Sequence, residues 1–456
     1  MAFARPQLQQ FAAREKTHFE QLLKDFVEIP SVSADPDHKP DLERCAELGL
    51  ATVRDFGGRA EIHRVRGGPP VVLGSFGSGK GQPTVTVYNH LDVVPASRDT
   101  EPWKTEPFEF TRRGDSYFGR GTTDDKGPAL SALFGARAAI EAGVPINIKV
   151  LWELEEEVGS PNFAETLRAI GSAASTDAVV VSDTVWVSRA RPALSAGLRG
   201  LQPMTLSLET AQTDQHSGTT GGVARNPVAE LAQVASEIFD ARTGRVKIPR
   251  FYDDVEKLTA KQIAGFKAAG FSIPRFKQAY DFSSVRTKDP LDAVKRLWAM
   301  PTFEVHGLVG GYTGPGVKTI VPPRAELKVS MRLVPNMKGE KVVKLVKAFV
   351  KKRNPDIRVE AGATAPAYKG ITSGPYVEAA QRAMKFAFGR DPVFVREGGT
   401  IGAILFMEQI LKCPIVFMGL SLPEHGYHAP NENYDWGQAG GGIAAFAKFF
   451  EEIAAR

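Results

Sequence analysis

The chain contains very little cysteine: only Cys45 and Cys413 among 456 residues, far apart in the sequence. A disulfide framework needs more cysteines at shorter spacings, so both are expected to be reduced thiols. The first twenty residues lack the unbroken apolar segment of a secretory signal peptide. No apolar run approaches the roughly eighteen residues that a membrane helix needs. We therefore expect no membrane span and a soluble, cytoplasmic protein.

A strong excess of charge is also missing. The 57 basic and 52 acidic residues give a net charge of +5, which produces only a weak electrostatic field around a chain of 456 residues. Nothing in this balance requires a nucleic-acid partner. Hydrophobic residues at 43% and charged residues at 24% are ordinary for globular proteins and exclude a disordered chain. At roughly 150 residues per domain, the length predicts two or three domains.

Short apolar strands alternate with helices up to about residue 195. An opening amphipathic helix is expected over residues 8–29, where Pro30 ends it. The alternation that follows is typical of βαβ units around a largely parallel sheet. The expected elements are strands 84–89, 146–152 and 177–181 and helices 128–142 and 161–170.

The middle of the chain, residues 196–385, has a different pattern. Strands 204–208 and 325–334 alternate apolar and polar residues, which predicts a sheet with one exposed face. Helices at 227–241 and 340–352, with patterned segments at 252–298, are expected to cover its apolar side. The last segments, residues 386–456, again alternate short apolar strands with helices. We therefore predict an α/β fold: one domain of residues 1–195 and 386–456, interrupted by an α+β insert of residues 196–385.

Acids and histidines cluster where the predicted strands of the first domain end. The carboxyl ends of parallel strands form one edge of a sheet, and open sheets place their sites there. Carboxylates gathered at this edge would repel one another unless a cation were present. The arrangement therefore predicts a metal centre. The residues concerned are His90, Asp92, Glu153, Glu155, Glu156, Glu157, Asp183, His425 and His428.

Each of these residues has a simpler explanation when taken alone. His90 with Asp92 could be a buried histidine satisfied by a neighbouring acid. Asp124 and Asp125 could cap the helix that begins near residue 128. Asp183 could be a turn residue, and His428 could lie in a surface loop. Without a metal, each of these separate explanations would have to apply by coincidence at the same edge of one sheet. We therefore favour a metal centre, which explains all of the residues together.

The motifs also resemble a known family. In this order the chain contains YNHLDVVP, GRGTTDDKGP, ELEEEVGS, VVVSDT, HSGTTGG, REGGT and HGYHAPNE. The order resembles that of the dinuclear zinc metallopeptidases that include carnosine dipeptidase, carboxypeptidase G, aminoacylase and acetylornithine deacetylase. The similarity spans nearly the whole chain and is greatest to the carnosine and cytosolic nonspecific dipeptidase branch. It implies a zinc-exopeptidase-like catalytic domain interrupted by a lid and dimerisation domain.

The resemblance also implies a site. Two divalent metal ions per subunit are expected, zinc first, although manganese or cobalt would suit the same ligands. Glu156 would be the general base. Asp92 would orient the His90 ring through a hydrogen bond with the ring nitrogen that does not bind the metal. The peptide bond between Asp124 and Asp125 would be cis. Asp124 would bridge the two ions, and the complete ligand set would be His90, Asp124, Glu157, Asp183 and His428.

Further residues are implied in substrate binding. In this family His216 and Thr319 would come from the insert of the partner subunit in a homodimer, with His216 stabilising the oxyanion. Arg332 would bind the substrate carboxylate, in a pocket also lined by Gly399 and Thr400. Taken alone, His216 could be a hydrogen-bonded loop histidine and Arg332 a surface arginine.

The expected reaction is metal-dependent hydrolysis of an amide bond in dipeptides or short peptides with a free C-terminal carboxylate. A hydroxide that bridges the metal ions would attack the carbonyl, with Glu156 as the base. An N-acyl-amino-acid deacylase would use the same chemistry and is the alternative. A noncatalytic receptor or scaffold on this fold would be expected to have lost ligands or the base, whereas all are present here.

Overall fold

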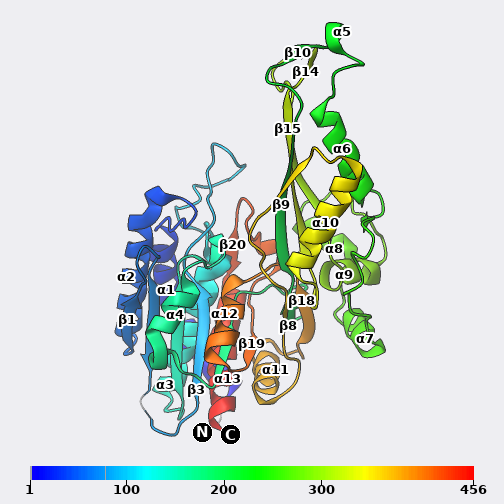
Figure 1. Ribbon diagram of the computed structural model, residues 1–456. Coiled ribbons are helices and arrows are strands. Elements are labelled where there is room, and N and C mark those ends of the chain that lie inside the picture. Colours follow the sequence, from blue (N-terminus) through cyan, green and yellow to red (C-terminus); the bar gives the residue numbers. More distant parts are fainter. Residues whose placement is uncertain (1–2, 78) are drawn as a thin grey trace.

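The computed structural model describes residues 3–77 and 79–456. Its centre is a six-stranded sheet in the order β1-β2-β6-β3-β7-β19 (Figure 1). The pairs β6/β3, β3/β7 and β7/β19 are parallel, while β1/β2 and β2/β6 are antiparallel. The prediction of a mostly parallel sheet is therefore confirmed. The strands are β1 (Arg59–His63), β2 (Val71–Phe76), β3 (Thr84–His90), β6 (Asn147–Glu153), β7 (Ala178–Val181) and β19 (Ile415–Phe417).

Helices cover both faces of this sheet, because its strands carry apolar side chains on each side (Figure 1). One face packs against the first group of helices and the other against α4 and α12. No helix within the described residues is long and apolar enough to cross a membrane. The first group is α1 (Arg5–Val27), α2 (Lys39–Asp55), α3 (Gly127–Glu141), α11 (Pro375–Phe388) and α13 (Trp436–Ala454); the second is α4 (Phe163–Ile170) and α12 (Gly402–Leu411).

The C-terminal part of the chain returns to this sheet, as predicted. Strand β19 pairs with β7, and helix α13 packs against α3. Strand β18 (Val393–Glu397) differs, because it pairs with β8 (Ala193–Leu198) in a separate three-stranded sheet that also contains β17 (Tyr368–Lys369). A further small sheet consists of β4 (Thr111–Arg113), β5 (Ser116–Phe118) and β20 (Asn433–Asp435).

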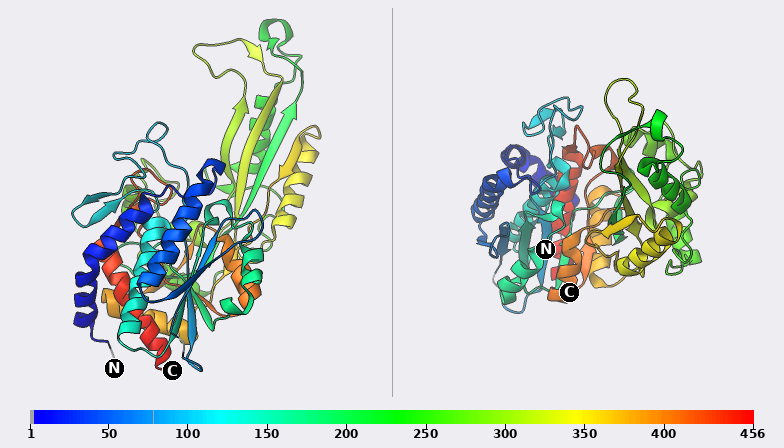
Figure 2. Two further views of the ribbon diagram at one scale, coloured as in Figure 1. Left: turned by 90° about the vertical axis from the view of Figure 1, so that its left-hand side faces the viewer. Right: turned by 45° about the horizontal axis from the view of Figure 1, so that its top comes forward.

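The insert is built on a four-stranded antiparallel sheet in the order β13-β15-β9-β16. Its apolar side chains, including Leu206, Leu327 and Met331, are buried against α6 and α10, as the alternating pattern predicts. The long strands project from the body and end in the small β10/β14 pair (Figure 2). The elements are β9 (Gly200–Glu209), β10 (Gln215–His216), α6 (Pro227–Ile238), β13 (Glu304–Gly310), β14 (Ile320–Val321), β15 (Arg324–Leu333), α10 (Gly339–Arg353) and β16 (Arg358–Ala361).

The expectation that segments 252–298 cover the insert sheet holds only at their start, where Tyr252 and Val255 pack against the insert core, and is wrong for the helices that follow. Phe266, Val294 and Trp298 are buried in the core of the first domain, and α7 and α9 contact β18. An apolar stripe shows that a helix packs, but it does not identify the sheet that receives it. The division of the chain at residues 195 and 385 stays a prediction. The helices concerned are α7 (Ala260–Ala268), α8 (Ile273–Ala279) and α9 (Pro290–Trp298).

Candidate metal centre and substrate site

Three of the predicted ligands meet at the carboxyl edge of the sheet. His90 is the last residue of β3, and Asp183 lies two residues beyond the end of β7. Nε2 of His90 lies 3.0 Å from Oδ1 of Asp124 and 3.8 Å from Oδ2 of Asp183. All three residues are buried. They form one group of side chains that can hold a metal ion.

Asp124 also belongs to a second group. Nε2 of His428 lies 3.0 Å from Oδ2 of Asp124 and 3.0 Å from Oε2 of Glu157. Asp124 therefore directs one carboxylate oxygen towards His90 and the other towards His428. The ligand atoms of each group lie within 4.8 Å of one another. Imidazoles and carboxylates in this arrangement fit zinc and also other divalent transition metals.

The electrostatics of the cluster also fit a cation. Burial, together with the negative charge of Asp124, raises the pKa of Asp183 to about 6 and that of Glu157 to about 7. Burial alone would lower the pKa of His90, but its hydrogen bonds with Asp124 and Asp92 raise that pKa well above its usual value. The buried acids therefore resist carrying their charges together. A divalent cation would stabilise their ionised forms.

Asp92 fixes the backbone of the glutamates in ELEEEVGS. Its Oδ1 accepts a hydrogen bond from the Glu156 amide at 3.1 Å, and its Oδ2 accepts one from the Glu157 amide at 3.0 Å. Nδ1 of His90 lies 3.0 Å from the Asp92 backbone oxygen and 3.5 Å from Oδ1. The closer contact to the ring is thus made by the carbonyl of Asp92 and not by the carboxylate that the resemblance suggests.

Glu156 lies beside the two groups but belongs to neither among the described residues. Burial raises the pKa of its carboxyl group well above the usual value; the nearby His90 lowers it, whereas Asp183 and Glu157 raise it further. The next residue, Glu157, provides an oxygen to the second group. The two adjacent glutamates are therefore placed differently, one beside the cluster and one within it.

Glu432 is a structural residue of the site that the sequence reasoning did not single out, although it ends the motif HGYHAPNE. Its Oε1 accepts hydrogen bonds from the amides of Thr123 and Asp124 at 2.9 and 3.1 Å. Its Oε2 accepts one from Arg120 Nη1 at 2.8 Å. The buried carboxylate thereby orients the loop that presents Asp124. The peptide bond between Asp124 and Asp125 is cis, as the resemblance implies.

Tyr427 is a second neighbour of the cluster that the sequence reasoning missed. Its hydroxyl donates a hydrogen bond to Oδ1 of Asp183 at 3.1 Å. Nε2 of His90 faces the other oxygen of that carboxylate, Oδ2. Tyr427 therefore helps to fix the orientation of Asp183. Its position next to His428 in the sequence was the available signal.

The predicted substrate residues Arg332 and Thr400 are in contact. Nη1 of Arg332 donates a hydrogen bond to Oγ1 of Thr400 at 3.3 Å, and the Thr400 hydroxyl donates one to the backbone oxygen of Arg199. Gly399 lies in the same loop. Arg199 is itself buried, and its Nε donates to the Gly398 oxygen at 3.3 Å. Burial and the charge of Arg332 lower the pKa of Arg199 to about 10. Sequence reasoning did not identify this second guanidinium.

His216 and Thr319 lie together at the tip of the insert. His216 pairs with Ile320 across the β10/β14 ladder, and the Ser217 amide donates to the Thr319 oxygen at 3.0 Å. The tip is at the far end of the arm from β3 and β19 (Figure 1). A single chain therefore does not bring His216 to the metal cluster. Its Nδ1 accepts a hydrogen bond from the Gly218 amide at 2.9 Å, which leaves Nε2 to carry the proton.

Comparison with known proteins identifies the family. Residues 86–452 match the family described as Peptidase family M20/M25/M40. The chain belongs to this family. Within M20/M25/M40, the chain is similar to the Cys-Gly metallodipeptidase dug1 of Schizosaccharomyces pombe, with 32% identity over 97% of this chain and 96% of the relative. It is also 31% identical to the human Beta-Ala-His dipeptidase, over 98% of this chain and 92% of the relative.

Solved structures of M20 peptidases have the same fold. The dipeptidase Dug1p of Saccharomyces cerevisiae superimposes with a TM-score of 0.89 at 28% identity, covering 100% of both chains. Human carnosine dipeptidase 1 has a TM-score of 0.85 at 29% identity, covering 99% of this chain and 100% of that one. The resemblance, the fold class and the prediction of a hydrolytic metallopeptidase are confirmed.

Proposed function

We propose that this M20/M25/M40 peptidase is a homodimeric dipeptidase that holds two divalent metal ions in each subunit, with zinc as the preferred metal. The observation that carries the proposal is Asp124, which is shared between two groups of ligands next to an uncoordinated glutamate. The dipeptidase names of the relatives support the substrate class. A cytoplasmic location belongs to the same proposal, since both cysteines are free thiols.

The ligands in this proposal are His90 and Asp183 for one ion, Glu157 and His428 for the other, and Asp124 for both. Bound there, the ions would supply Lewis-acid activation of the scissile carbonyl and of the attacking water. Glu156 accepts a proton from that water on its carboxylate and then donates it to the leaving amine nitrogen. Burial raises the pKa of Glu156, and a raised pKa suits a group that must both accept and release a proton near neutral pH.

We assign substrate orientation to residues outside the two groups of metal ligands. The Arg332 guanidinium binds the C-terminal carboxylate of the dipeptide, with Thr400 and the Gly399 backbone beside it. His216 of the partner subunit donates its Nε2 proton to the oxygen of the attacked carbonyl, and Thr319 of the partner subunit lies next to it. Such a hydrogen-bond donor stabilises the transition state by about 3 to 4 kcal/mol. The exposed position of both residues at the tip of the insert supports this arrangement.

A parallel assay of dipeptides and N-acetyl-amino acids tests the proposal. The metal-loaded enzyme should hydrolyse dipeptides at least tenfold faster than the acylated amino acids. Exhaustive chelation should abolish the activity, and readdition of the metal should restore it. Full activity after chelation would contradict the metal centre. A preference for N-acetyl-amino acids would indicate a deacylase instead.

A further inference from the structure

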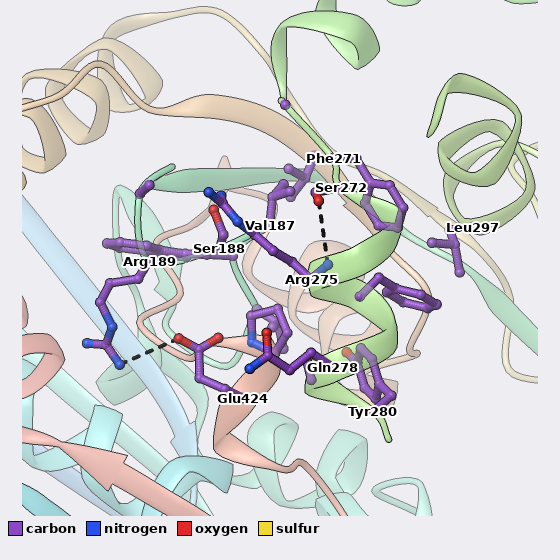
Figure 3. Close-up of a pocket in the computed structure, with 18 of the residues that line it drawn as sticks. Val187, Ser188, Arg189, Phe271, Ser272, Arg275, Gln278, Tyr280, Leu297 and Glu424 are labelled. Atoms are coloured by element: carbon purple, nitrogen blue, oxygen red, sulfur yellow. Dashed lines mark hydrogen bonds and ion pairs between the residues drawn. The ribbon is translucent and has the colours of Figure 1, made fainter. Parts of the chain in front are cut away.

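A cavity of about 720 Å³ is lined by segments that lie next to two proposed metal ligands in the sequence (Figure 3). Residues 185–190, which follow Asp183 directly, form one wall, and Pro423 and Glu424, which precede His428, contribute to another. Helices α8 and α9 of the insert close the opposite side. Glu397, which also lines the cavity, is near enough to Asp183 for their charges to interact, so a substrate whose scissile bond is at the metal ligands can extend towards the cavity. Its volume is in the range of sites that enclose small ligands.

The cavity contains positive charge without a protein counter-ion. Arg275 extends from α8 across the cavity towards Ser188 (Figure 3). Within residues 3–77 and 79–456, no carboxylate lies within 4.0 Å of the guanidinium of Arg275 or of Arg396, which also lines the cavity. Arg189 is different, because Asp435 binds it with two hydrogen bonds of 3.0 and 2.8 Å. Arg396 lies over the Phe266 ring and interacts with the charge of Glu256, so Arg275 is the cation of the cavity that is available to an anion.

The two acids of the cavity are already engaged. Glu424 lies 3.6 Å from Arg189, and Oε1 of the half-buried Glu397 accepts a hydrogen bond from the Val185 amide at 3.2 Å. Neither acid lies within the 4.0 Å contact distance of Arg275 among the described residues. The remaining charge in the cavity is thus positive.

The rest of the lining suits a side chain that has both carbon atoms and a polar end. Trp186, Phe271, Phe276 and Trp298 supply apolar surface. Apolar walls strengthen the attraction between a guanidinium and a carboxylate, because they reduce screening by water. A carboxylate on a short methylene chain can pair with Arg275 while its methylene groups contact these walls.

We propose that this cavity binds an acidic side chain of the substrate, with Arg275 as its principal specificity-determining residue. The inference rests on the proposed function, since it places a dipeptide at the metal ligands. The C-terminal carboxylate itself is assigned to Arg332 and Thr400, and Thr400 is the last residue of the motif REGGT, which begins with Arg396 in β18. The cavity therefore recognises a second carboxylate. Either the residue on the amino side of the scissile bond or the C-terminal residue can supply it.

Matched peptides separate these two sources. The metal-loaded enzyme is assayed with Glu-Ala against Gln-Ala and with Ala-Glu against Ala-Gln. In one pair, kcat/KM should be about tenfold higher for the acidic peptide, and that pair identifies the residue that enters the cavity. Arg275→Gln should bring this ratio close to one. Lys277→Gln removes the same charge from α8 outside the cavity lining, and it should keep the ratio.

A binding measurement makes the inference independent of turnover. Trp186 and Trp298 line the cavity, so tryptophan fluorescence should report peptide binding to the metal-loaded Glu156→Gln protein. Kd should be about tenfold lower for the acidic peptide than for its amide, and Arg275→Gln in the same background should remove the difference. If wild type cleaves no dipeptide but this preference in Kd exists, the proposed function fails and the cavity assignment stands. Equal Kd values for both pairs would overturn the assignment, as would equal losses in Arg275→Gln and Lys277→Gln.

Discussion

Asp92 and Glu156 are joined by a hydrogen bond in which Oδ1 of Asp92 accepts the backbone amide of Glu156 at 3.1 Å. The other oxygen of the same carboxylate accepts the amide of Glu157 at 3.0 Å. One buried side chain thus fixes the backbone of the proposed base and of a proposed metal ligand. Because Asp92 follows β3 and the glutamates follow β6, the contact also joins the ends of two adjacent parallel strands.

Asp92→Asn should impair catalysis through this backbone contact. The amide group has a single acceptor oxygen, so one of the two backbone N–H groups would face an NH₂ donor. We expect kcat/KM for dipeptides to fall about 10- to 100-fold, the usual effect of losing a group that orients metal ligands. Glu155→Gln is the matched control, because Glu155 binds Asn162 outside the metal groups. A loss of equal size in the control would show that Asp92 has no specific positioning role.

Glu156→Gln should separate base chemistry from metal binding. The substitution keeps the size of the side chain but removes the proton acceptor, while the five proposed ligands remain. We expect about two metal ions per chain by elemental analysis and a decrease in kcat of several orders of magnitude. Glu157→Gln should instead lower the metal content. If Glu156→Gln loses the metal and Glu157→Gln keeps it, the two roles are assigned in the wrong order.

His216 in the insert provides a test of the dimer. His216→Ala and Glu156→Gln should each give inactive homodimers, because every site then lacks its oxyanion donor or its base. A mixed dimer has one site that combines intact Glu156 from one chain with intact His216 from the other. Reassembly of the two variants should therefore restore about half of the wild-type activity per heterodimer. Absence of rescue despite proven subunit exchange would mean that His216 does not act across the interface.

Arg332→Leu should affect substrates according to their C-terminus. The guanidinium is half-buried and contacts Thr400, and a bidentate pair with a carboxylate is worth about 2 to 4 kcal/mol. KM for dipeptides with a free carboxylate should rise strongly, whereas KM for C-terminally amidated peptides should change little. Steady-state kinetics with matched peptides measure the difference. Equal effects on both substrate types would place Arg332 outside carboxylate recognition.

Glu153 gives a prediction about stability and pH. Burial raises its pKa to about 8, while the unfolded chain ionises near pH 4.3. Between these values the unfolded state loses its proton first, so this group makes the protein less stable as pH rises. In metal-free protein, Glu153→Gln should gain about 3 to 4 kcal/mol relative to wild type between pH 5 and pH 9. Urea unfolding measures this change.

The exposed Glu47 provides the control for that experiment. Glu47→Gln makes the same change of residue at an exposed position of α2 and controls for the general effect of replacing Glu by Gln on the unfolding free energy. A Glu153→Gln difference that stays constant between pH 5 and pH 9 would show that the folded protein keeps Glu153 ionised.

The sequence by itself determined many of the helices and strands, and it pointed to the proposed ligands that follow strand ends. Residues 325–333 alternate between apolar and polar because successive side chains of a strand point to opposite faces, and β15 occupies Arg324–Leu333. His90 and Asp183 could be grouped in advance, since parallel strands end at a common edge. Asp124 and Glu157 depended on the order of the family motifs, which holds over nearly the whole chain.

Only the tertiary structure decided which surfaces meet. The apolar side chains of α7 and α9 do not specify which sheet they contact, and packing placed these helices on β18 of the β17-β8-β18 sheet. The partners of Asp92, the support of the Asp124 loop by Glu432 and the burial of Arg199 all join residues far apart in the sequence or on different elements. The local periodicity of a segment shows which of its faces is buried and which is exposed. Contacts between distant polar groups depend on where the folded backbone places both partners, and no local pattern contains that information.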